Sequence, residues 1–430
     1  MTSHLSTYNL KAVIHETGLT PATLRAWERR YGLLKPQRSP GGHRLYTQDD
    51  IEMLKWLVAR QAEGLSISHA VELWRNLGEN TPAQIQPAAS SLLRASSSSM
   101  LDQLRRDWLA ACLAFDAPAA ELAIAQALAM VAPEVVCTEL LQKGLAELGE
   151  GWYTGTVSVQ QEHFASSLAM RRLNALFAVA PAPTRPDRLL AACPPGEAHD
   201  LALLMLSFIL RWRGWEVVYL GANVPLTRLD ATLQSTGPRM VLSVAQTLPG
   251  AAALSELAGY VNAQAVPLAY GGGIFNHIPT LTERIPGYFL GYEISAVPKV
   301  IEHLFLRKPA LPTPQPLPTT YPTVLARFNE KAALIVASVN VALKNGPIAP
   351  QHLKEANFNL TNSIASALAL GNIHFLDHSV GWLKGLLENY NLSPTLAAQY
   401  YAAYHLAVQK NLGSQAEPIL DWLAKVETTA

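Results

Sequence analysis

The sequence predicts a multidomain α and α/β protein of 430 residues. Between residues 188 and 290, short apolar segments alternate with helical stretches, which is the pattern of a Rossmann-like, doubly wound parallel sheet. The segments on either side of it have helical periodicity. One Ser/Ala-rich break and one Pro-rich break divide the chain further. The predicted strands are residues 189–192, 216–220, 240–244, 267–270 and 288–290.

These breaks and patterns predict six consecutive segments. The first, residues 1–86, consists of short helices with one Gly/Pro-rich interruption. Residues 87–99 are expected to be a flexible linker, and residues 100–182 a bundle of amphipathic helices. The sheet domain spans residues 187–306 and ends at a Pro-rich linker, residues 307–322. Residues 323–430 are predicted to form a C-terminal helical bundle.

Composition excludes several classes of protein. With 15% charged and 49% hydrophobic residues, the chain is not an extended disordered protein. The three cysteines, Cys112, Cys137 and Cys193, lie far apart and form no CxxC pair, so neither a disulfide framework nor a zinc site is indicated. The longest apolar run, residues 201–210, is half a membrane span, and no signal peptide is apparent. We therefore expect a cytoplasmic protein without a membrane partner.

Net charge is zero, with 33 basic and 33 acidic residues, but the charge is unevenly distributed. Residues 20–46 contain six Arg or Lys and one acid, Glu28, a local charge of +5. Because the totals cancel, the remainder of the chain carries −5. The neutral total, which alone would argue against a nucleic-acid partner, therefore conceals a basic patch.

The basic patch lies on a predicted helix-turn-helix. A helix over residues 10–16 and a tight turn precede a second helix over residues 20–31, in which Thr20 is the expected N-cap and Pro21 occupies the first turn. Thr23 and Arg25 fall near the start of the second helix, where a recognition helix meets base edges. The Gly/Pro-rich loop that follows can present a wing to the phosphates.

The string LRAWERRYGLLKPQRSPGGHRLYTQDDI resembles the winged helix-turn-helix of the MerR regulator family, over roughly residues 7–76. The resemblance implies a domain that binds operator DNA. It assigns the recognition helix or its surroundings to Thr23, Arg25, Arg29 and Arg30, and the wing to Arg38, Arg44 and Tyr46. In the alternative interpretation, Trp27, Leu45 and Tyr46 are core residues and the arginines form a solvated face. We expect Trp27 and Leu45 in the core and the arginines on DNA.

Small and polar residues follow the strands of the predicted sheet. His199, with Glu197 two residues before it, follows the first strand and lies at the carboxyl edge, where open α/β sheets bind ligands. A histidine there can ligate a metal through one ring nitrogen while a carboxylate orients the other. Gly221, Ser243, Gly272 and Gly273 follow or end the later strands at the same edge. Such small residues leave a trench that admits a nucleotide-like tail.

Together, GEAHDLALLMLSFILRWRGWEVVYLGANVP, Ser243 and the GGG at 271–273 resemble the cobalamin-binding domain of methyltransferases and mutases. The family motif Asp-x-His-x-x-Gly reads here Glu197-x-His199-x-x-Ala202, so a carboxylate is kept and a methyl group is added. The resemblance implies a buried dimethylbenzimidazole tail and His199 as the lower axial cobalt ligand. Without these surrounding motifs, His199 would be interpreted as an ordinary loop histidine.

The helices before the sheet contain a second signal. Nine residues separate Trp152 from Glu162, which is followed directly by His163; on a helix the latter two point about 100° apart. This resembles the four-helix cap of the CarH/LitR-type cobalamin photoreceptors, which are MerR-type repressors. That resemblance implies adenosylcobalamin, with Trp152 covering the adenosyl group, Val159 and Glu162 contacting it, and His163 becoming the upper cobalt ligand after photolysis. The alternative is a core Trp and a surface Glu–His pair.

We recognise no relative of residues 323–430. They contain four histidines and a tyrosine cluster, namely His352, His374, His378, His405, Tyr400, Tyr401 and Tyr404. His374 and His378 are spaced to share one helix face, as in a metal or haem site, but no carboxylate or cysteine lies at ligand spacing. We expect ordinary histidines and a bundle for oligomerisation or protein contact; the alternative is a second sensor that binds a bilin or haem.

Together these observations predict a regulator and not an enzyme. The chain is expected to be a transcriptional repressor that binds operator DNA in the dark as a homo-oligomer, a dimer or tetramer, and releases it when light photolyses adenosylcobalamin. Two alternatives keep the regulator: one senses cobalamin without light, and the other receives its main input through the C-terminal bundle. A corrinoid-dependent enzyme subunit is disfavoured because no barrel-like βα series remains for an active site.

Overall fold

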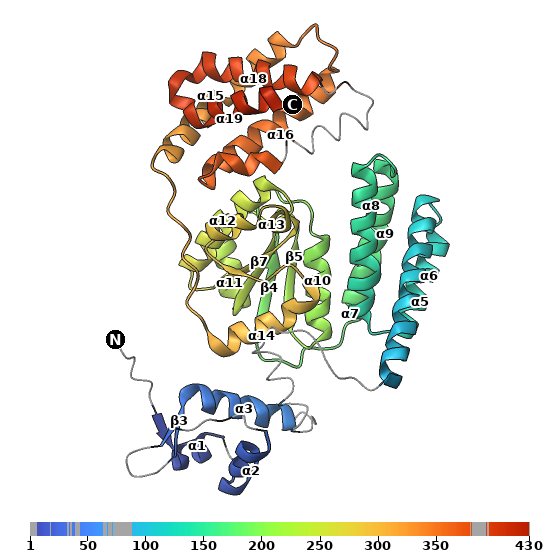
Figure 1. Cartoon of the computed structure of the whole chain (residues 1–430), viewed down its shortest axis with the longest axis vertical. Helices are drawn as coiled ribbons and strands as arrows, with labels where there is room; N and C mark the ends of the chain where they lie inside the picture. Colours follow the sequence, from blue (N-terminus) through green and yellow to red (C-terminus); the bar gives the residue numbers. More distant parts are fainter. Residues whose placement is uncertain are drawn as a thin grey trace. The chain divides into compact units, whose positions relative to one another are not determined.

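The computed structural model describes residues 7–17, 19–31, 34, 37–38, 44–62, 67, 71, 88–378, 380, 393 and 395–429. The chain divides into two units. The first contains the N-terminal helices and strands together with residues 299–309, and the second contains residues 88–298 and the chain from Ala310 onward (Figure 1).

The N-terminal unit contains a helix-turn-helix beside a small antiparallel sheet of order β1-β3-β2. Its elements are β1 (Thr7–Asn9), α1 (Leu10–Thr17), α2 (Pro21–Tyr31), β2 (Gln37–Arg38), β3 (Arg44–Thr47) and α3 (Gln48–Ala62). The predicted N-cap of the second helix is present, since Thr20 Oγ1 accepts a hydrogen bond from the Thr23 N–H at 3.1 Å. The fold class predicted for this part of the chain is confirmed.

The second unit begins with a helical cap. Its elements are α5 (Ala88–Leu113), α6 (Ala117–Met130), α7 (Pro133–Val135), the π-helix η1 (Val136–Gln142), α8 (Lys143–Tyr153) and α9 (Val159–Ala178). Residues 88–99, which we expected to belong to a flexible linker, form the first turns of α5. The physical reason is that alanine, leucine and arginine in this segment favour helix, and the serines oppose it only weakly.

A short connection separates the two cap helices that contain the predicted site residues. Trp152 lies in the last turn of α8, and α9 restarts after Ser158. Ser158 and Gln161 form a reciprocal capping box, and the Gln161 amide also donates to the Leu113 carbonyl at 2.8 Å. The first turns of α9 therefore hold Glu162 and His163 in a defined position relative to α5.

The sheet that follows has five parallel strands in the order β5-β4-β6-β7-β8. The strands are β4 (Arg188–Ala192), β5 (Glu216–Gly221), β6 (Met240–Val244), β7 (Leu268–Gly271) and β8 (Tyr288–Phe289). Between and after them lie α10 (Leu201–Trp212), α11 (Leu229–Thr236), α12 (Leu248–Ala263), α13 (Gly273–His277), η2 (Pro279–Arg284), η3 (Ile294–Ala296) and α14 (Val297–Arg307). The predicted doubly wound sheet is confirmed, and the observed strands lie within one residue of the predicted ones.

Helix α10 is buried between the sheet and the cap. Every residue from Leu203 to Leu210 is buried, and Phe208 shares one hydrophobic core with Trp108 and Leu168 of the cap (Figure 1). Burial on all sides explains why residues 201–210 form such a continuous apolar run. In the described part of the chain, no helix combines the length and the hydropathy that a membrane span requires.

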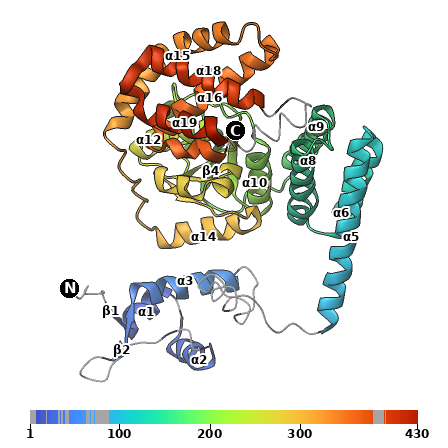
Figure 2. The ribbon, with the colours of Figure 1, turned by 45° about the horizontal axis from the view of Figure 1, so that its top comes forward.

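The C-terminal helices pack against α12 of the sheet domain. They comprise α15 (Thr320–Ala342), α16 (Pro350–Ala369), η4 (Ile373–Leu376), α18 (Thr395–Leu412), η5 (Gly413–Ala416) and α19 (Glu417–Thr429). Helix α16 contacts α12, and Leu254 of α12 and Ile364 of α16 belong to one continuous core (Figure 2). The sequence predicted a separate module, whereas the structure places these helices in the same unit as the sheet.

The histidines and tyrosines of this region have local partners. His374 Nδ1 lies 3.2 Å from Asp377 Oδ2, so the expectation that no carboxylate lies at ligand spacing is wrong. His378 instead stacks on His277, with ring centroids 4.6 Å apart. The predicted tyrosine cluster, Tyr400, Tyr401 and Tyr404, is buried in the core. Among the described residues, no group of three or more His, Cys, Asp or Glu side chains is arranged to hold a metal ion.

Candidate functional site

The loop between β4 and α10 carries a histidine that is oriented by a buried carboxylate. His199 Nδ1 lies 2.6 Å from Glu197 Oε1. The His199 side chain is 66% exposed, whereas that of Glu197 is 1% exposed. The imidazole therefore projects from the carboxyl edge of the sheet, as the sequence predicted, and its Nδ1 is fixed by the buried Glu197 carboxylate.

The His199 ring and two backbone N–H groups favour the ionised form of the Glu197 carboxylate. Oε1 accepts from the His199 N–H at 3.1 Å, and Oε2 accepts from the Gln246 N–H at 2.8 Å. Burial alone would raise the pKa of Glu197, but the hydrogen bonds from His199 and Gln246 outweigh burial and lower it. The same contact with Glu197 raises the pKa of His199, although burial opposes the shift. Since an ionised carboxylate accepts the Nδ1 proton, Nε2 is the nitrogen left for a metal ion.

A glycine that the sequence analysis did not identify makes room for this carboxylate. A Cβ on Gly250, in the first turn of α12, would lie 2.3 Å from Glu197 Oε2. The Gly250 N–H donates to the N-cap Thr247 Oγ1 at 3.0 Å, which fixes the backbone there. No signal in the sequence around Gly250 connects it with Glu197, because the two are brought together only by the β4–α10 and β6–α12 loops meeting at the sheet edge.

A cavity of about 690 Å³ lies between the cap and this edge of the sheet. Residues of α8 and α9 line one side, and the β4–α10 loop and the start of α10 line the other. The predicted residues that meet in this cavity are Trp152, Val159, Glu162 and His163 from the cap, together with His199 and Ala202. The structure thus brings together residues that are up to 50 positions apart, as Trp152 and Ala202 are.

Glu162 and His199 are charged or titratable groups that face the cavity from its two sides. Glu162 is half-buried, and its Oε1 accepts a hydrogen bond from Ser166 Oγ at 2.5 Å. Its negative charge contributes to the raised pKa of His199, to a smaller extent than Glu197 does. His163 is exposed, and Trp152 and Val159 are half-buried. The cavity therefore combines an apolar wall, two imidazoles and the carboxylates of Glu162 and Asp200.

The other predicted residues of the sheet domain lie at the strand ends outside this cavity. Ser243 is 1% exposed, and its hydroxyl has no hydrogen-bond partner among the described residues. Gly272 has a φ of +126°, and a Cβ there would lie 2.0 Å from the Ala245 carbonyl oxygen. The Gly273 N–H donates to Gln246 Oε1 at 2.8 Å, and Gly221 has a φ of +83°. At this edge, the positive φ angles of Gly221 and Gly272 disfavour any residue that has a Cβ.

In the N-terminal unit, the predicted DNA contact by Tyr46 is corrected. Its side chain is fully buried, and its hydroxyl donates to Glu28 Oε1 at 3.1 Å. Burial and the adjacent charge of Glu28 raise the pKa of Tyr46 to about 12. Glu28 Oε2 also pairs with Arg44 Nε at 3.4 Å. Glu28, which appeared in the sequence only as the one acid of the patch, therefore joins the recognition helix to the strand β3.

The structure describes the side chains of only some of the remaining residues predicted to contact DNA. Arg25 is exposed, and Thr23 is half-buried with its hydroxyl 2.8 Å from that of Thr20. Backbone pairing places Arg38 opposite Arg44 in the β2–β3 ladder. The side chains of Arg29, Arg30 and Arg38 lie outside the described residues. Of the predicted core residues, Trp27 is buried and Leu45 is half-buried.

Three segments of the chain match known protein families. Residues 8–77 match the MerR HTH family of regulatory proteins, and residues 104–176 and 187–301 each match a B12 binding domain. The corrinoid protein for monomethylamine of Methanosarcina barkeri covers 48% of this chain and 99% of its own, with 17% identity and a TM-score of 0.40.

Two transcriptional repressors of Myxococcus xanthus are similar over more than half of the chain. The HTH-type transcriptional repressor CarH is 34% identical over 235 residues, 55% of this chain and 77% of that protein. The HTH-type transcriptional repressor CarA is 33% identical over 239 residues, 55% of this chain and 75% of that protein. With its helix-turn-helix and two B12-binding segments in the same chain, this protein belongs to the family of cobalamin-dependent, MerR-type transcriptional regulators that includes CarH and CarA.

Proposed function

We propose that this regulator is a light-responsive repressor that uses adenosylcobalamin. In this proposal residues 1–86 bind operator DNA, and residues 100–182 and 187–306 together hold the cofactor. The observation that carries the proposal is the single cavity in which Trp152, Glu162 and His163 of the cap face His199 of the sheet domain. The tryptophan, the carboxylate and the second imidazole on the cap side favour this proposal over a light-independent sensor.

Features of the chain fit the cofactor on both sides of His199. The Nε2 of His199 is the free ring nitrogen of an imidazole held by a buried carboxylate, which is the usual arrangement of a metal-ligating histidine. The unpartnered Ser243 hydroxyl and the backbone at Gly272, where no Cβ fits, suit a polar tail entering between strand ends. When bound, adenosylcobalamin supplies a cobalt–carbon bond that light breaks.

Each cap residue then has a distinct role. Trp152 and Val159 would form an apolar wall against the adenosyl group, and Glu162 would accept a hydrogen bond from it. Ser166 donates to Glu162 Oε1 and so keeps this carboxylate oriented. His163 points to another side of α9 and would be available as a cobalt ligand in the absence of the adenosyl group.

The output follows from a two-state packing of the cap. Contacts from Trp152 and Glu162 to a bound adenosyl group would favour one arrangement of the cap against the sheet domain, and without that group this bias would be absent. We propose that the first arrangement supports a homo-oligomer that presents several winged helices to repeated half-sites. Because each basic footprint is small, affinity depends on how many engage at once.

The test combines a visible spectrum and a gel on the same sample. Operator DNA is selected from a random-sequence library with the loaded protein in darkness. Green light should change the cobalamin spectrum and weaken binding to the selected DNA by about tenfold or more, within the usual range of coupling energies. Unchanged DNA binding after complete photolysis would contradict the proposal.

A substitution separates this proposal from a cobalamin sensor that does not use light. His163→Ala should leave dark DNA binding intact and alter the spectrum and the DNA affinity reached after illumination. Gln160→Ala is the matched control, because Gln160 is exposed on the same first turn of α9 and does not line the cavity. If His163→Ala responds to light as the unmodified protein does, the role assigned to His163 is wrong.

Ser243→Ala should lower cobalamin affinity without lowering the thermal stability of the cofactor-free protein. An unsatisfied buried hydroxyl costs about 1–3 kcal/mol, so its removal should leave the thermal stability of the cofactor-free protein unchanged or raised. If the hydroxyl serves the cofactor tail, cobalamin affinity should fall by roughly fivefold or more. Spectral titration and thermal melting measure the two effects. Equal cobalamin affinity in both proteins would remove Ser243 from the site.

A further inference from the structure

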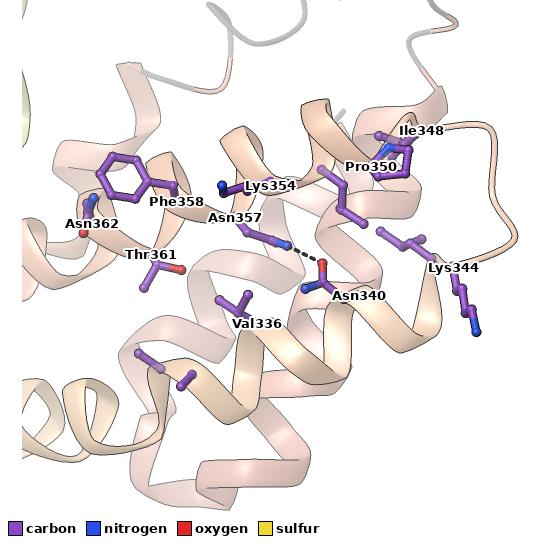
Figure 3. Close-up of a pocket in the computed structure, with 14 residues that line it drawn as sticks. Val336, Asn340, Lys344, Ile348, Pro350, Lys354, Asn357, Phe358, Thr361 and Asn362 are labelled. Atoms are coloured by element: carbon purple, nitrogen blue, oxygen red, sulfur yellow. Dashed lines mark hydrogen bonds between the residues drawn. The ribbon is translucent and has the colours of Figure 1, made fainter.

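The C-terminal helices contain a second large cavity, which the proposed function does not use. It has a volume of about 610 Å³ and lies between α15, α16 and the loop that joins them (Figure 3). This volume is in the range of cavities that bind small molecules. The two helices line it at helical spacing, with Ala333, Val336 and Asn340 on α15 facing Leu353, Asn357 and Thr361 on α16.

Most of the wall is apolar. Val336, Leu343, Ile348 and Leu353 contribute aliphatic side chains, and Ala333 leaves space between them. Phe358 lines the same groove and is 67% exposed. Covering an exposed phenylalanine and an aliphatic groove with an apolar molecule releases water from both, which favours binding.

The groove also contains neutral polar side chains whose positions are fixed by hydrogen bonds. Asn357 is 1% exposed, and its amide donates to Asn340 Oδ1 at 2.9 Å (Figure 3). Its Oδ1 accepts from Tyr400 Oη at 3.0 Å. Thr361 Oγ1 lies 2.8 Å from Tyr404 Oη. Tyr400 and Tyr404 belong to the buried core, so this network fixes the amides rather than leaving them to rotate.

The charged residues of the groove are both cations. Lys344 and Lys354 line it, no carboxylate lines it, and within the described residues no acidic side chain pairs with either lysine. A haem would require an axial ligand, and the lining contains no histidine, cysteine, methionine or tyrosine. The recognised chemistry is therefore an extended apolar body with an anionic group.

We propose that the α15–α16 groove binds an organic carboxylate with a long apolar body. The apolar wall takes the body, and Lys344 or Lys354 takes the carboxylate, with the Asn340–Asn357 pair as a secondary donor. A fatty acid and a linear tetrapyrrole with propionate groups share this chemistry. The site is independent of the cobalamin cavity and does not depend on the light response.

Equilibrium dialysis of the full-length protein, loaded with cobalamin and kept in darkness, tests the site with radiolabelled dodecanoate. Ala333→Trp should lower dodecanoate affinity at least tenfold by filling the groove. Ala337→Trp is the matched control, because Ala337 is exposed on the same helix and does not line the groove. Thermal melting checks that both variants fold. If the two variants bind dodecanoate equally, the groove is not the site.

Charge recognition and ligand source are tested in the same assay. Dodecanol should compete at least tenfold less well than unlabelled dodecanoate, and this preference should disappear in the double variant Lys344→Ala/Lys354→Ala. Lys331→Ala serves as the control, since Lys331 pairs with Glu330 at 3.0 Å and lies outside the groove. Competition by biliverdin with a shifted visible absorption identifies the tetrapyrrole as the source, and stronger competition by dodecanoate identifies the fatty acid. Equal competition by the alcohol and the acid would overturn the proposal.

Discussion

Gly250→Ala is expected to weaken cobalamin binding by roughly 10- to 100-fold, the usual cost of losing a group that orients a metal ligand. The added Cβ would lie 2.3 Å from Glu197 Oε2. A carboxylate at the end of a free side chain could move aside, but this one is 1% exposed and bonded at both oxygens. Displacing it breaks the hydrogen bond from the Gln246 N–H and releases the His199 ring from its orientation.

Two companion variants make this prediction specific. Gly259→Ala on the same helix should leave cobalamin affinity unchanged, because a Cβ there meets no atom within 4 Å. Glu197→Asp shortens the carboxylate by one methylene, so Gly250→Ala should cost less in that background than in the unmodified protein. Spectral titration with cobalamin in darkness measures the affinities of the unmodified protein, Gly250→Ala, Glu197→Asp and the double variant, which form a double-mutant cycle. Additive losses, or a Gly250→Ala affinity within twofold of the unmodified protein, would show that Glu197 does not need this space.

Arg25→Ala is expected to weaken operator binding on the order of 100-fold. An arginine that contacts DNA from a recognition helix contributes about 1–3 kcal/mol, and an oligomer on repeated half-sites loses that contact once for each half-site. Arg25 is exposed in the second turn of α2, so its removal leaves the core intact. Gel retardation with operator DNA in darkness, at a fixed salt concentration, measures the loss.

Tyr46→Phe separates a DNA contact from a core role. The buried hydroxyl bonds Glu28, so its loss should cost about 0.5–1.5 kcal/mol of folding stability and leave operator affinity within about threefold. Lys55→Ala is the control for Arg25→Ala, because it also removes a positive charge from the unit. Lys55 lies on α3 and pairs with Glu16 of α1 at 2.5 Å. A loss for Tyr46→Phe as large as that for Arg25→Ala would restore the tyrosine to the DNA interface.

Much of the fold could be predicted because it depends on local patterns. Alternating apolar segments identified the five strands within one residue, and Thr20 with Pro21 identified the start of the recognition helix. The linker prediction for residues 87–99 was drawn from the Ser and Ala content, yet residues 88–99 are helical because alanine and leucine favour helix. The resemblance of the surrounding motif directed attention to His199 and Glu197, and the structure shows the contact between them.

Other parts of the site depend on residues that are distant in the sequence. Gly250 and Gln246 support Glu197 although about fifty positions separate them from it, and neither stands in a recognisable motif. Tyr46 is adjacent to wing arginines, which made it a candidate for DNA, but pairing of β3 with β1 and contact with Glu28 turn it inward.

The sequence by itself determined the helix-turn-helix and the parallel sheet, whereas the residues proposed for the cofactor and DNA sites came from its resemblance to known families. The helix-turn-helix and the sheet depend on periodicity and on spacings of a few residues, which hydrogen bonding and side-chain direction within one element dictate. Only the tertiary structure decided that the cap faces His199 across one cavity, that Glu197 rests on Gly250, and that α16 packs on α12. The physical reason is that such contacts are made between elements, and close packing of their apolar faces selects which elements meet.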